Sequence, residues 1–589
     1  MMTSDTRIPP PTNSIISPLL TDFYQISMAY SYWKTNRHEE NAVFELFFRK
    51  NPFGGEFTIF CGLDEVLKFM ENFKLSRSDL EYLKSVPLLS NCESEFFDEY
   101  LANLDCSEVI MHSMKQGTVA FPRVPLMIIS GPLGIVQWIE TTLLNLVNYP
   151  SLVATNAARM VMAAKEEQAI EKHPLLIEFG LRRAQGPDGG FSASKYSFIG
   201  GFDGTSNVQA GNILGIPIAG THAHSFIQSH SCLDDAKGLK LKVKDCEEVV
   251  DLLQKVLRYR NEMEYDWKCT NESELAAFIA YGTSFPDNFL CLIDTYDSLK
   301  SGLKNFILVA LALNDCGYIP KGIRLDSGDL SKLSLACAQL FEEIAKRLNR
   351  PFLKKMQIIA SNDINEDVLH SLNQQGHSIN VFGIGTNLVT CQKQPALGCV
   401  YKLVELNGKA RMKLSQDFEK VLIPGKKEVY RLFGSSGCPL LDLMIGVNES
   451  KPQVSQRIMC LHPFDEQKRV AVVPSRVEAL HSLVFNGKDK VVGDLPSLLE
   501  SKKVSANLLF PTMIKFQINA CFLFKIIQNR IISNVHPFFL QHVKNQIKCM
   551  QPDIFRHLNP DQYKVSVSDS LFKSFHSLWL SESPVIEIH

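Results

Sequence analysis

Short apolar runs recur through the middle of the chain, and each ends in small or polar residues before a helix-like stretch. This alternation predicts parallel strands joined by helices, in either an α/β barrel or an open doubly wound sheet. Both folds place their functional site at the carboxyl ends of the strands, so polar residues at the ends of these runs are the candidates. The runs, between Leu175 and Val389, are LLIEFGLRR, IPIAGTHAH, NFLCLIDTY, GIRLDSGDL, MQIIASNDI and INVFGIGTN.

The flanking regions have different patterns. Towards the N-terminus, AVFELFFRKNPFGGEF predicts a strand and a turn, LDEVLKFMENF a helix, and VPLMIISGPL another strand. Helical spacing covers 137–172, with a break expected near Pro150. The charged segment 231–274 is expected to be helical and to lie outside the parallel core. After Val400, CVYKLVELNGKARMKL has Asn-Gly between two strand-like runs, which predicts an antiparallel hairpin.

Composition narrows the class of protein. The 589 residues are 45% hydrophobic and 21% charged, as is usual for globular proteins, and acidic residues exceed basic ones only by 63 to 61. That balance gives no overall signal for nucleic acid or membrane binding. The chain has no run of about 18 apolar residues, and its proline-rich start does not resemble a signal peptide. The 15 cysteines include no C-x-x-C pair, which argues against zinc or a disulfide framework and suits the reducing cytoplasm.

Two of the predicted strand ends carry arginines. In EFGLRRAQGPDGG, Arg182 and Arg183 precede a glycine-rich loop that suits phosphate, although a surface loop with solvated arginines fits as well. In GIRLDSGDL, Arg324 and Asp326 are two positions apart and should face the same side. Asp or Ser there also suits a helix N-cap. An arginine this deep on a strand requires partners, however, which strengthens the case for a functional site.

A third candidate is VFGIGTNLVT, where Gly383 and Gly385 would let the backbone approach a phosphate at the start of a helix. The motif is weak when taken alone. The preceding strand ends in ASNDI, whose Ser361 and Asn362 would share this role.

The stretch GTHAHSF contains His222 and His224, separated by one residue. A metallohydrolase barrel would require further histidines at the other strand ends, where only Asp294 and Asp326 occur. His370 and His377 are expected in a helix and a turn. Packing of both histidines remains an alternative, but a single reactive histidine is favoured.

These motifs together resemble the nicotinate phosphoribosyltransferases, which belong to the type II phosphoribosyltransferases. The resemblance keeps the order of the family's motifs and covers about Leu19 to Pro496, with a further match near the C-terminus. Its specificity is high because many motifs agree. They are LLTDFYQISMAYSYW, FELFFRKNPFGG, SLVATNAARM, FGLRRAQGPDGG, GTHAHSF, IRLDSGDL, GIGTNLVTC and GCVYKLV.

The resemblance implies an activity and an assembly. The family condenses nicotinate with 5-phosphoribosyl 1-diphosphate to give nicotinate mononucleotide and diphosphate, in NAD salvage. ATP hydrolysis is coupled to this reaction through a phosphohistidine, with Mg2+ (or Mn2+). The enzymes are homodimers whose active sites lie at the subunit interface. Sister enzymes that use nicotinamide or quinolinate, a barrel metallohydrolase and a non-catalytic binding protein are the alternatives.

The resemblance also implies site residues. His224 matches the phosphorylated histidine, whereas His222 matches no functional position. Asp294 and Asp326 match acidic residues near that histidine and the magnesium diphosphate, as catalytic and metal-binding groups. The expected nicotinate-binding residues are Tyr24, reaching in from the partner subunit, Phe179, Thr221 and Arg324. The expected phosphoribosyl-diphosphate-binding residues are Arg182, Ser361, Asn362, Gly383, Gly385 and Thr386.

The implied fold class is α/β, with an irregular α/β barrel beside a mixed α/β domain built from the N- and C-terminal segments. Residues 504–546 are expected to be an insertion into the family pattern. This segment has a biased composition without clean periodicity, so it is interpreted as translated non-coding sequence in preference to a lineage-specific element. The expected parts are a disordered tail (1–18), an N-terminal mixed domain (19–150), the barrel (151–400), a β-rich part packing with the N-terminal domain (401–503), an insertion (504–546) and a C-terminal tail (547–589).

Overall fold

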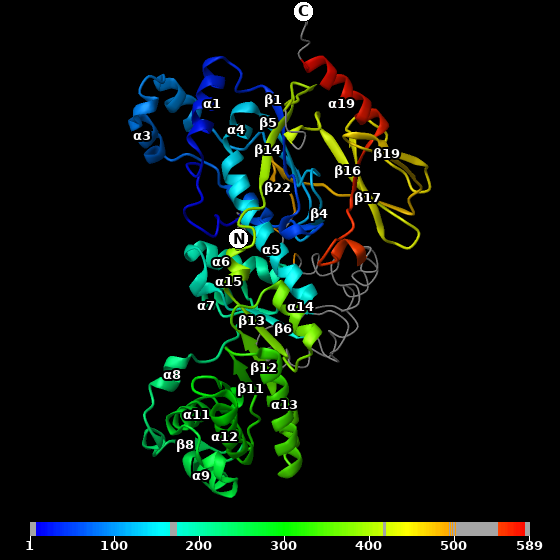
Figure 1. The fold of residues 1–589 in the computed structure, drawn as a ribbon. Helices are drawn as coiled ribbons and strands as arrows, with labels where there is room; N and C mark the ends of the chain where they lie inside the picture. Colours follow the sequence, from blue (N-terminus) through cyan, green and yellow to red (C-terminus); the bar gives the residue numbers. More distant parts are fainter. Residues whose placement is uncertain are drawn as a thin grey trace, which may run out of the picture. The chain divides into compact units, whose positions relative to one another are not determined.

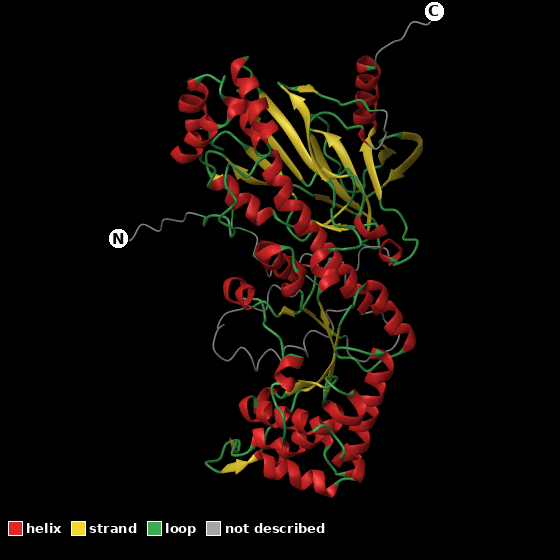
Figure 2. Ribbon diagram, turned by 60° about the vertical axis from the view of Figure 1, so that its left-hand side comes forward, coloured by secondary structure: helices red, strands yellow, loops and turns green. Residues whose placement is uncertain are grey.

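The computed structural model describes residues 8–164, 174–415, 420–493 and 552–583, with the single positions 495, 497, 498 and 501. The expected insertion, 504–546, lies outside the described residues. The chain forms two units. The terminal unit comprises 1–158, 199–201 and 393–589, and the barrel unit comprises 159–198 and 202–392. Both contain helices and strands (Figures 1 and 2), so the expected α/β class is confirmed.

The core of the barrel unit is a six-stranded sheet in which all neighbouring strands are parallel. Five of its strands are those predicted from the apolar runs. The last predicted strand pairs with the first, which curls the sheet towards a barrel. In sheet order, the strands are β10 (Leu290–Leu292), β11 (Gly322–Leu325), β12 (Gln357–Ser361), β13 (Val381–Ile384), β6 (Leu175–Glu178) and β7 (Gly204–Thr205).

The barrel is irregular because one predicted strand scarcely pairs. The run IPIAGTHAH contributes a single parallel bridge, between Thr205 and Ile218, instead of a strand. Pro217 has no N–H to donate, and its carbonyl accepts from Thr205 N at 3.0 Å. In the described part of the chain no strand pairing joins this segment to β10, so the barrel has an open seam there.

Helices follow most strands of the barrel unit, as the alternating pattern predicts. Helix α13 packs against β11 and β12 (Figure 1). The helices are α6 (Gly186–Ile199), α7 (Val208–Leu214), α8 (His224–Gln228), α9 (Leu252–Glu262), α10 (Tyr265–Lys268), α11 (Glu272–Ser284), α12 (Leu303–Asp315), α13 (Leu330–Arg347), α14 (Glu366–Gln375) and α15 (Thr386–Thr390).

The charged segment 231–274 is only partly helical, so the expectation of an all-helical segment was wrong. Strand β8 (Lys240–Lys242) pairs antiparallel with β9 (Val249–Asp251) before α9 begins. The residues of β8, Lys-Leu-Lys, alternate between polar and apolar with only the leucine buried, which suits a half-exposed strand better than a helix.

The terminal unit is built from segments far apart in the sequence. Strand β14 (Cys399–Leu406) pairs antiparallel with β1 (Asn41–Phe48), and the two lie side by side in Figure 1. The predicted hairpin is present, because β14 also pairs with β15 (Lys409–Ala410) across Asn407 and Gly408. Both turn residues have positive φ values, 50° and 72°, which explains the choice of Asn-Gly.

This unit contains one antiparallel sheet, which includes these strands, and one mixed sheet, in which only β17 and β23 pair in parallel. The first has the order β15-β14-β1-β5-β3-β21-β22 and the second β19-β18-β23-β17-β16-β20. Their remaining strands are β3 (Ile110–Ser113), β5 (Met127–Pro132), β16 (Lys427–Phe433), β17 (Pro439–Gly446), β18 (Ile458–His462), β19 (Asp465–Val472), β20 (Arg476–Ala479), β21 (Ser482–Asn486), β22 (Lys490–Val491) and β23 (Lys564–Ser568). A small pair, β2 (Thr58–Ile59) and β4 (Val119–Ala120), lies outside them. The helices are α1 (Phe23–Lys34), α2 (Leu63–Glu71), α3 (Arg77–Ser85), α4 (Leu133–Trp138) and α19 (Asp569–Glu582).

Helix α5 (Glu140–Ala164) continues through Pro150, so the predicted break is wrong. Proline cannot bond the carbonyl of Leu146, one turn earlier. That carbonyl instead faces Gly62 so closely that a Cβ there would lie 2.0 Å from its oxygen. Ser151 Oγ, beside the proline, accepts from Cys61 N at 3.0 Å. Neighbouring chain therefore stabilises the helix where its own ladder is interrupted.

Candidate active site

Polar side chains gather at the carboxyl edge of the parallel sheet. Glu178 ends β6, Arg324 is the third residue of β11 and Ser361 ends β12. Because parallel strands end at the same edge, residues separated by up to 183 positions meet there. This is the edge at which the sequence predicted a site.

Arg324 and Asp326 bond each other, as their two-residue spacing predicted. Arg324 Nη2 donates to Asp326 Oδ1 at 2.8 Å, and Arg324 Nε donates to Ser361 Oγ at 2.8 Å. The Ser361 hydroxyl in turn donates to Asp326 Oδ1. The guanidinium carbon lies 5.5 Å from the centre of the Phe179 ring. A cation, an aromatic face and a carboxylate therefore share one corner of the site.

The ionised form of Asp326 is favoured. Burial alone would raise the pKa of this carboxyl, but the hydrogen bond from Ser361 and the charge and hydrogen bond of Arg324 outweigh it, so the pKa is lowered. The nearby imidazole of His224 acts in the same direction. Asp326 does not act as the N-cap of α13, although its position in the sequence allowed that role. That role falls to Asp329, whose side chain accepts from Lys332 N at 3.0 Å.

His224 lies at the open seam of the barrel. It is the first residue of α8, and its Nδ1 lies 3.1 Å from Thr295 Oγ1, in the loop after β10. Its Nε2 lies 3.6 Å from Asp326 Oδ2 and 4.0 Å from Asp294 Oδ1. The imidazole is 39% exposed, so one face remains open to a ligand.

Asp294 is a buried carboxylate that holds Asp326 and Ser327 in position beside His224. Its side chain is only 2% exposed, and Oδ2 accepts from Asp326 N at 3.0 Å and from Ser327 Oγ at 2.6 Å. Its other oxygen, Oδ1, is buried and has no hydrogen-bond partner among the described residues. A buried carboxylate oxygen left unpaired is costly, which marks this atom as a ligand-binding candidate.

His222 has a different environment from His224. Its ring packs at 5.4 Å from Phe226, 6.4 Å from Phe278 and 4.8 Å from Tyr281, measured between ring centres. Burial lowers the pKa of His222 to about 4, so the imidazole is neutral at physiological pH. Its partners are apolar rings and not metal-binding groups.

The glycines of VFGIGTNLVT line the same edge, against Phe179. A Cβ at Gly383 would lie 2.4 Å from the Phe179 ring, and a Cβ at Gly385 would lie 3.2 Å from the Phe179 carbonyl oxygen. Thr386, the first residue of α15, and Arg182 are both exposed. Glycine is therefore required here for packing of the aromatic ring as well as for any approach of phosphate.

Comparisons with known proteins agree across the chain. Family models of nicotinate phosphoribosyltransferase match residues 19–148 (N-terminal domain), 175–432 (family) and 426–510 (C-terminal domain). Nicotinate phosphoribosyltransferase from Dictyostelium discoideum is 49% identical over 98% of this chain and 91% of its own, and nicotinate phosphoribosyltransferase 1 from Arabidopsis thaliana is 48% identical over 98% and 97%. The chain belongs to the nicotinate phosphoribosyltransferase family. The crystal structure of human nicotinic acid phosphoribosyltransferase matches with 38% identity and a TM-score of 0.77, covering 95% of this chain and 99% of that one.

The barrel unit holds every family site residue predicted above except one. Thr221 is half-buried and donates through Oγ1 to the His222 carbonyl at 3.2 Å. Asn362 follows β12 with a φ of 86°, an uncommon value for a residue other than glycine. Tyr24 lies on α1 in the terminal unit, where its side chain is 46% exposed. The barrel unit alone therefore lacks the tyrosine that the family resemblance assigns to nicotinate.

Three residues beside the site were not singled out from the sequence. Thr295 and Ser327 bond His224 and Asp294, and Glu178 is completely buried under Phe179. Ser327 lies inside the motif GIRLDSGDL, and Glu178 interrupts an apolar strand, so both carried a signal. Thr295 stands at the end of the run NFLCLIDTY and so carried a weak signal, but its partner could not be predicted, because its role depends on the loop after β10 meeting α8.

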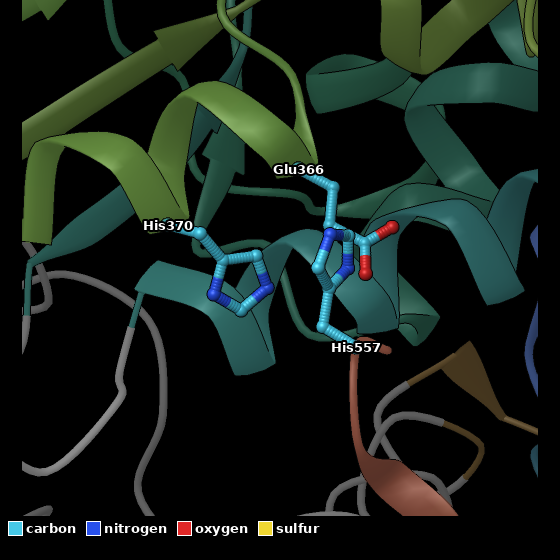
Figure 3. Close-up of side chains that lie close together, drawn as sticks. All are labelled: Glu366, His370 and His557. Carbon is cyan, nitrogen blue, oxygen red and sulfur yellow. The ribbon is translucent and has the colours of Figure 1, made fainter. Parts of the chain in front are cut away.

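Among the described residues, no group of possible metal ligands includes a histidine of GTHAHSF. Figure 3 shows Glu366 and His370 one turn apart on α14; the third labelled residue, His557, belongs to the terminal unit. Both carboxylate oxygens of Glu366 bond Arg159 in the barrel unit, at 2.8 and 2.9 Å. That carboxylate is thus engaged in a buried ion pair. Within the described residues, no helix is long and apolar enough to cross a membrane.

Proposed function

We propose that the protein condenses nicotinate with 5-phosphoribosyl 1-diphosphate, forming the bond between the pyridine nitrogen and ribose C1 and releasing diphosphate. The observation that carries the proposal is the pairing of Arg324 with Phe179 at the carboxyl edge of the barrel. Arg324 uses Nε and Nη2 for Ser361 and Asp326, while Nη1 has no protein partner among the described residues. This guanidinium suits a carboxylate on a ring that lies against an aromatic face. Nicotinate has such a carboxylate and nicotinamide lacks it.

ATP use would proceed through His224. The carboxylates of Asp294 and Asp326 face Nε2 and so favour the tautomer that carries its proton there. The lone pair of Nδ1, which now faces the Thr295 hydroxyl, is then available to accept a phosphoryl group. A phosphorylated imidazole would add negative charge beside the two carboxylates, which gives ATP a means of changing the site.

Asp294 and Asp326 also suit a magnesium ion. The buried, unpaired Oδ1 of Asp294 and the Oδ2 of Asp326 are hard oxygen donors facing the same imidazole. Magnesium bound there would neutralise charge on the leaving diphosphate. The chain's own part is to hold Asp326 ionised, through Arg324 and Ser361, and to orient Asp294 through Ser327.

A homodimer in the reducing cytoplasm is the proposed setting. Tyr24 lies beside Phe23, itself 41% exposed, on α1. Two neighbouring exposed aromatic side chains suit a surface that a second copy covers, as the family resemblance implies for Tyr24. The absence of C-x-x-C pairs among the cysteines supports the compartment.

The test is a steady-state assay of product formation with nicotinate, 5-phosphoribosyl 1-diphosphate, Mg2+ and ATP, with nicotinamide and quinolinate as competing acceptors. We expect nicotinate to be the preferred acceptor, with a higher kcat/KM than either competitor. Faster turnover of nicotinamide would overturn the assignment in favour of a sister enzyme.

ATP coupling is tested with His224→Ala. This variant should lose phosphoenzyme formation and the ATP hydrolysed per product, while keeping some nicotinate condensation, because Arg324 and Phe179 are unchanged. Incubation with γ-labelled ATP followed by alkaline work-up reports the phosphoenzyme. Ser225→Ala, at the next and exposed position of α8, is the control and should label as the wild type does. Unchanged ATP coupling in His224→Ala would refute the role.

A further inference from the structure

Glu178 is a buried carboxylate directly before the aromatic residue of the proposed nicotinate site. It ends β6 and has no exposed surface. Its Oε1 accepts from the backbone N–H of Gly180, and its Oε2 accepts from Ser194 Oγ at 2.8 Å and Thr205 Oγ1 at 2.5 Å. The carboxylate thus holds both its own strand end and two neighbouring elements, α6 and β7.

Asn207 extends the network to a fourth element. It is the N-cap of α7, where its Oδ1 accepts from Ala210 N. Its backbone N–H donates to Thr205 Oγ1 at 2.9 Å, and its Nδ2 donates to Ser194 Oγ at 3.1 Å. The Thr205 hydroxyl is thereby oriented so that its proton points at Glu178, while the Ser194 hydroxyl lies within reach of both Glu178 Oε2, at 2.8 Å, and the Gly190 carbonyl, at 3.0 Å.

The network requires an acceptor-only group at position 178. All three partners donate to it, and among the described residues Glu178 forms no ion pair with Lys, Arg or His. A buried carboxylate without a cation is costly, and its three hydrogen bonds offset that cost only in part. A glutamine at position 178 would place its NH2 group against one of these donors. Neither the NH2 group nor that donor would then have an acceptor.

This arrangement fixes the backbone on both sides of Phe179. The Phe179 N–H donates to the Ile384 carbonyl at 2.8 Å, and the next N–H, of Gly180, is held by the Glu178 side chain. The ring itself lies between Arg324, at 5.5 Å, and Gly383, where a Cβ would lie 2.4 Å away. A small rotation of the 178–180 backbone would therefore move the ring off the guanidinium.

We propose that Glu178 is a positioning residue for the nicotinate site: its buried carboxylate, held by Gly180, Ser194 and Thr205, keeps the Phe179 ring in place beside Arg324. Glu178 itself touches no substrate and acts only through Phe179. The inference rests on the proposed function, since it assigns the ring of Phe179 to the pyridine.

The test is a double-mutant cycle of Glu178→Gln with Phe179→Leu, measured as KM for each substrate. Glu178→Gln should raise the KM for nicotinate roughly ten-fold while the KM for 5-phosphoribosyl 1-diphosphate changes less than about two-fold. In the Phe179→Leu background, Glu178→Gln should add little, because the ring through which it acts is gone.

Glu274→Gln is the matched control. Glu274 is also a fully buried glutamate of the barrel unit, whose Oε2 accepts from Ser301 at 2.6 Å and Asn305 at 3.0 Å, but it has no link to Phe179. It should leave the KM for nicotinate unchanged and should be additive with Phe179→Leu.

Three results would overturn the inference: an equal rise in both KM values, an unchanged KM for nicotinate, or additivity of Glu178→Gln with Phe179→Leu. If Glu178→Gln does not fold, Ser194→Ala decides the matter, because it removes one of the hydrogen bonds to Glu178, together with the one from Asn207, and keeps the carboxylate. It should raise the KM for nicotinate selectively, by a smaller factor. A wild-type enzyme inactive with nicotinate would instead refute the proposed function, so the two failures are distinct.

Discussion

Two of the arginine–aspartate pairs among the described residues, one in each unit, also contact aromatic rings but differ in their burial. In the terminal unit, Arg431 on β16 faces Asp442 on β17 and bonds both of its carboxylate oxygens, at 2.7 and 2.8 Å. Both side chains are buried, at 3% and 0% exposure. In the barrel unit, Arg324 gives one nitrogen to Asp326 and another to Ser361, with 15% and 20% exposure for the pair.

Aromatic rings accompany both guanidinium groups. Arg431 lies 5.3 Å from Phe121 and 5.9 Å from Tyr563, whose hydroxyl also donates to Asp442 at 3.1 Å. Its remaining hydrogen bond goes to the Val119 carbonyl, at 2.9 Å. Both charged groups of this pair are buried, so a ligand has no access to them from solvent.

The Arg324–Asp326 pair is partly exposed and keeps polar atoms that a ligand could bind. The barrel-edge arginine has Phe179 on one side and keeps Nη1 without a described protein partner, and Asp326 still presents Oδ2 to His224. Burial, and not the identity of the residues, therefore separates the structural ion pair from the pair at the site. Substitutions at the two pairs should consequently fail in different measurements.

The largest effect is expected at the buried pair, Arg431 and Asp442. Asp442→Ala leaves the Arg431 charge buried without a partner and should lower the free energy of unfolding by about 3–5 kcal/mol. Denaturant unfolding measures this effect. Asp465→Ala, which removes an exposed partner of Lys468 at the start of β19, should cost no more than about 1 kcal/mol. Equal costs for the two variants would break the comparison.

A smaller effect, on kcat/KM instead of stability, is expected at the partly exposed pair, Arg324 and Asp326. Arg324→Lys keeps the charge but loses the planar fork, so kcat/KM for nicotinate should fall roughly 100-fold, or about 2–3 kcal/mol. Its free energy of unfolding should change by less than about 1 kcal/mol, because the group is partly solvated. Arg347→Lys, at an exposed position of α13, is the control and should leave both quantities unchanged. A variant that unfolds readily yet binds nicotinate normally would contradict the distinction.

The predictable part of the molecule was that governed by local pattern. Strands β6 and β10–β13 follow from short apolar runs, and the β14–β15 hairpin follows from Asn-Gly, because burial and turn geometry act over a few residues. The alignment of Arg324 with Asp326 followed from strand periodicity in the same way.

Long-range contacts decided the rest. Nothing near Pro150 in the sequence reveals that Gly62 lies against the Leu146 carbonyl and lets α5 continue. Likewise, Thr295 meets His224 only because the barrel seam stays open between Ile218 and β10. The roles assigned to Tyr24, Thr386 and the other site residues came from family resemblance and are proposals.

The smallest expected effect concerns the two histidines of GTHAHSF, which repeat the contrast between a buried and a partly exposed group at positions two apart. His222 is held neutral by burial, with its pKa lowered from 6.5 to about 4. The unfolded chain takes up this proton as the pH falls from about 6.5 to 4 and the folded chain does not, so wild-type stability is lost across that window. His222→Phe, which suits the neighbouring Phe226 and Tyr281 rings, should abolish that part of the loss, worth about 2 kcal/mol at pH 4.5. Urea unfolding of both proteins between pH 7.5 and 4 tests this, with the offset at pH 7.5 as internal control for packing. Parallel stability profiles would mean that His222 is not buried as a neutral side chain, and loss of ATP coupling in this variant would move it from packing into the site.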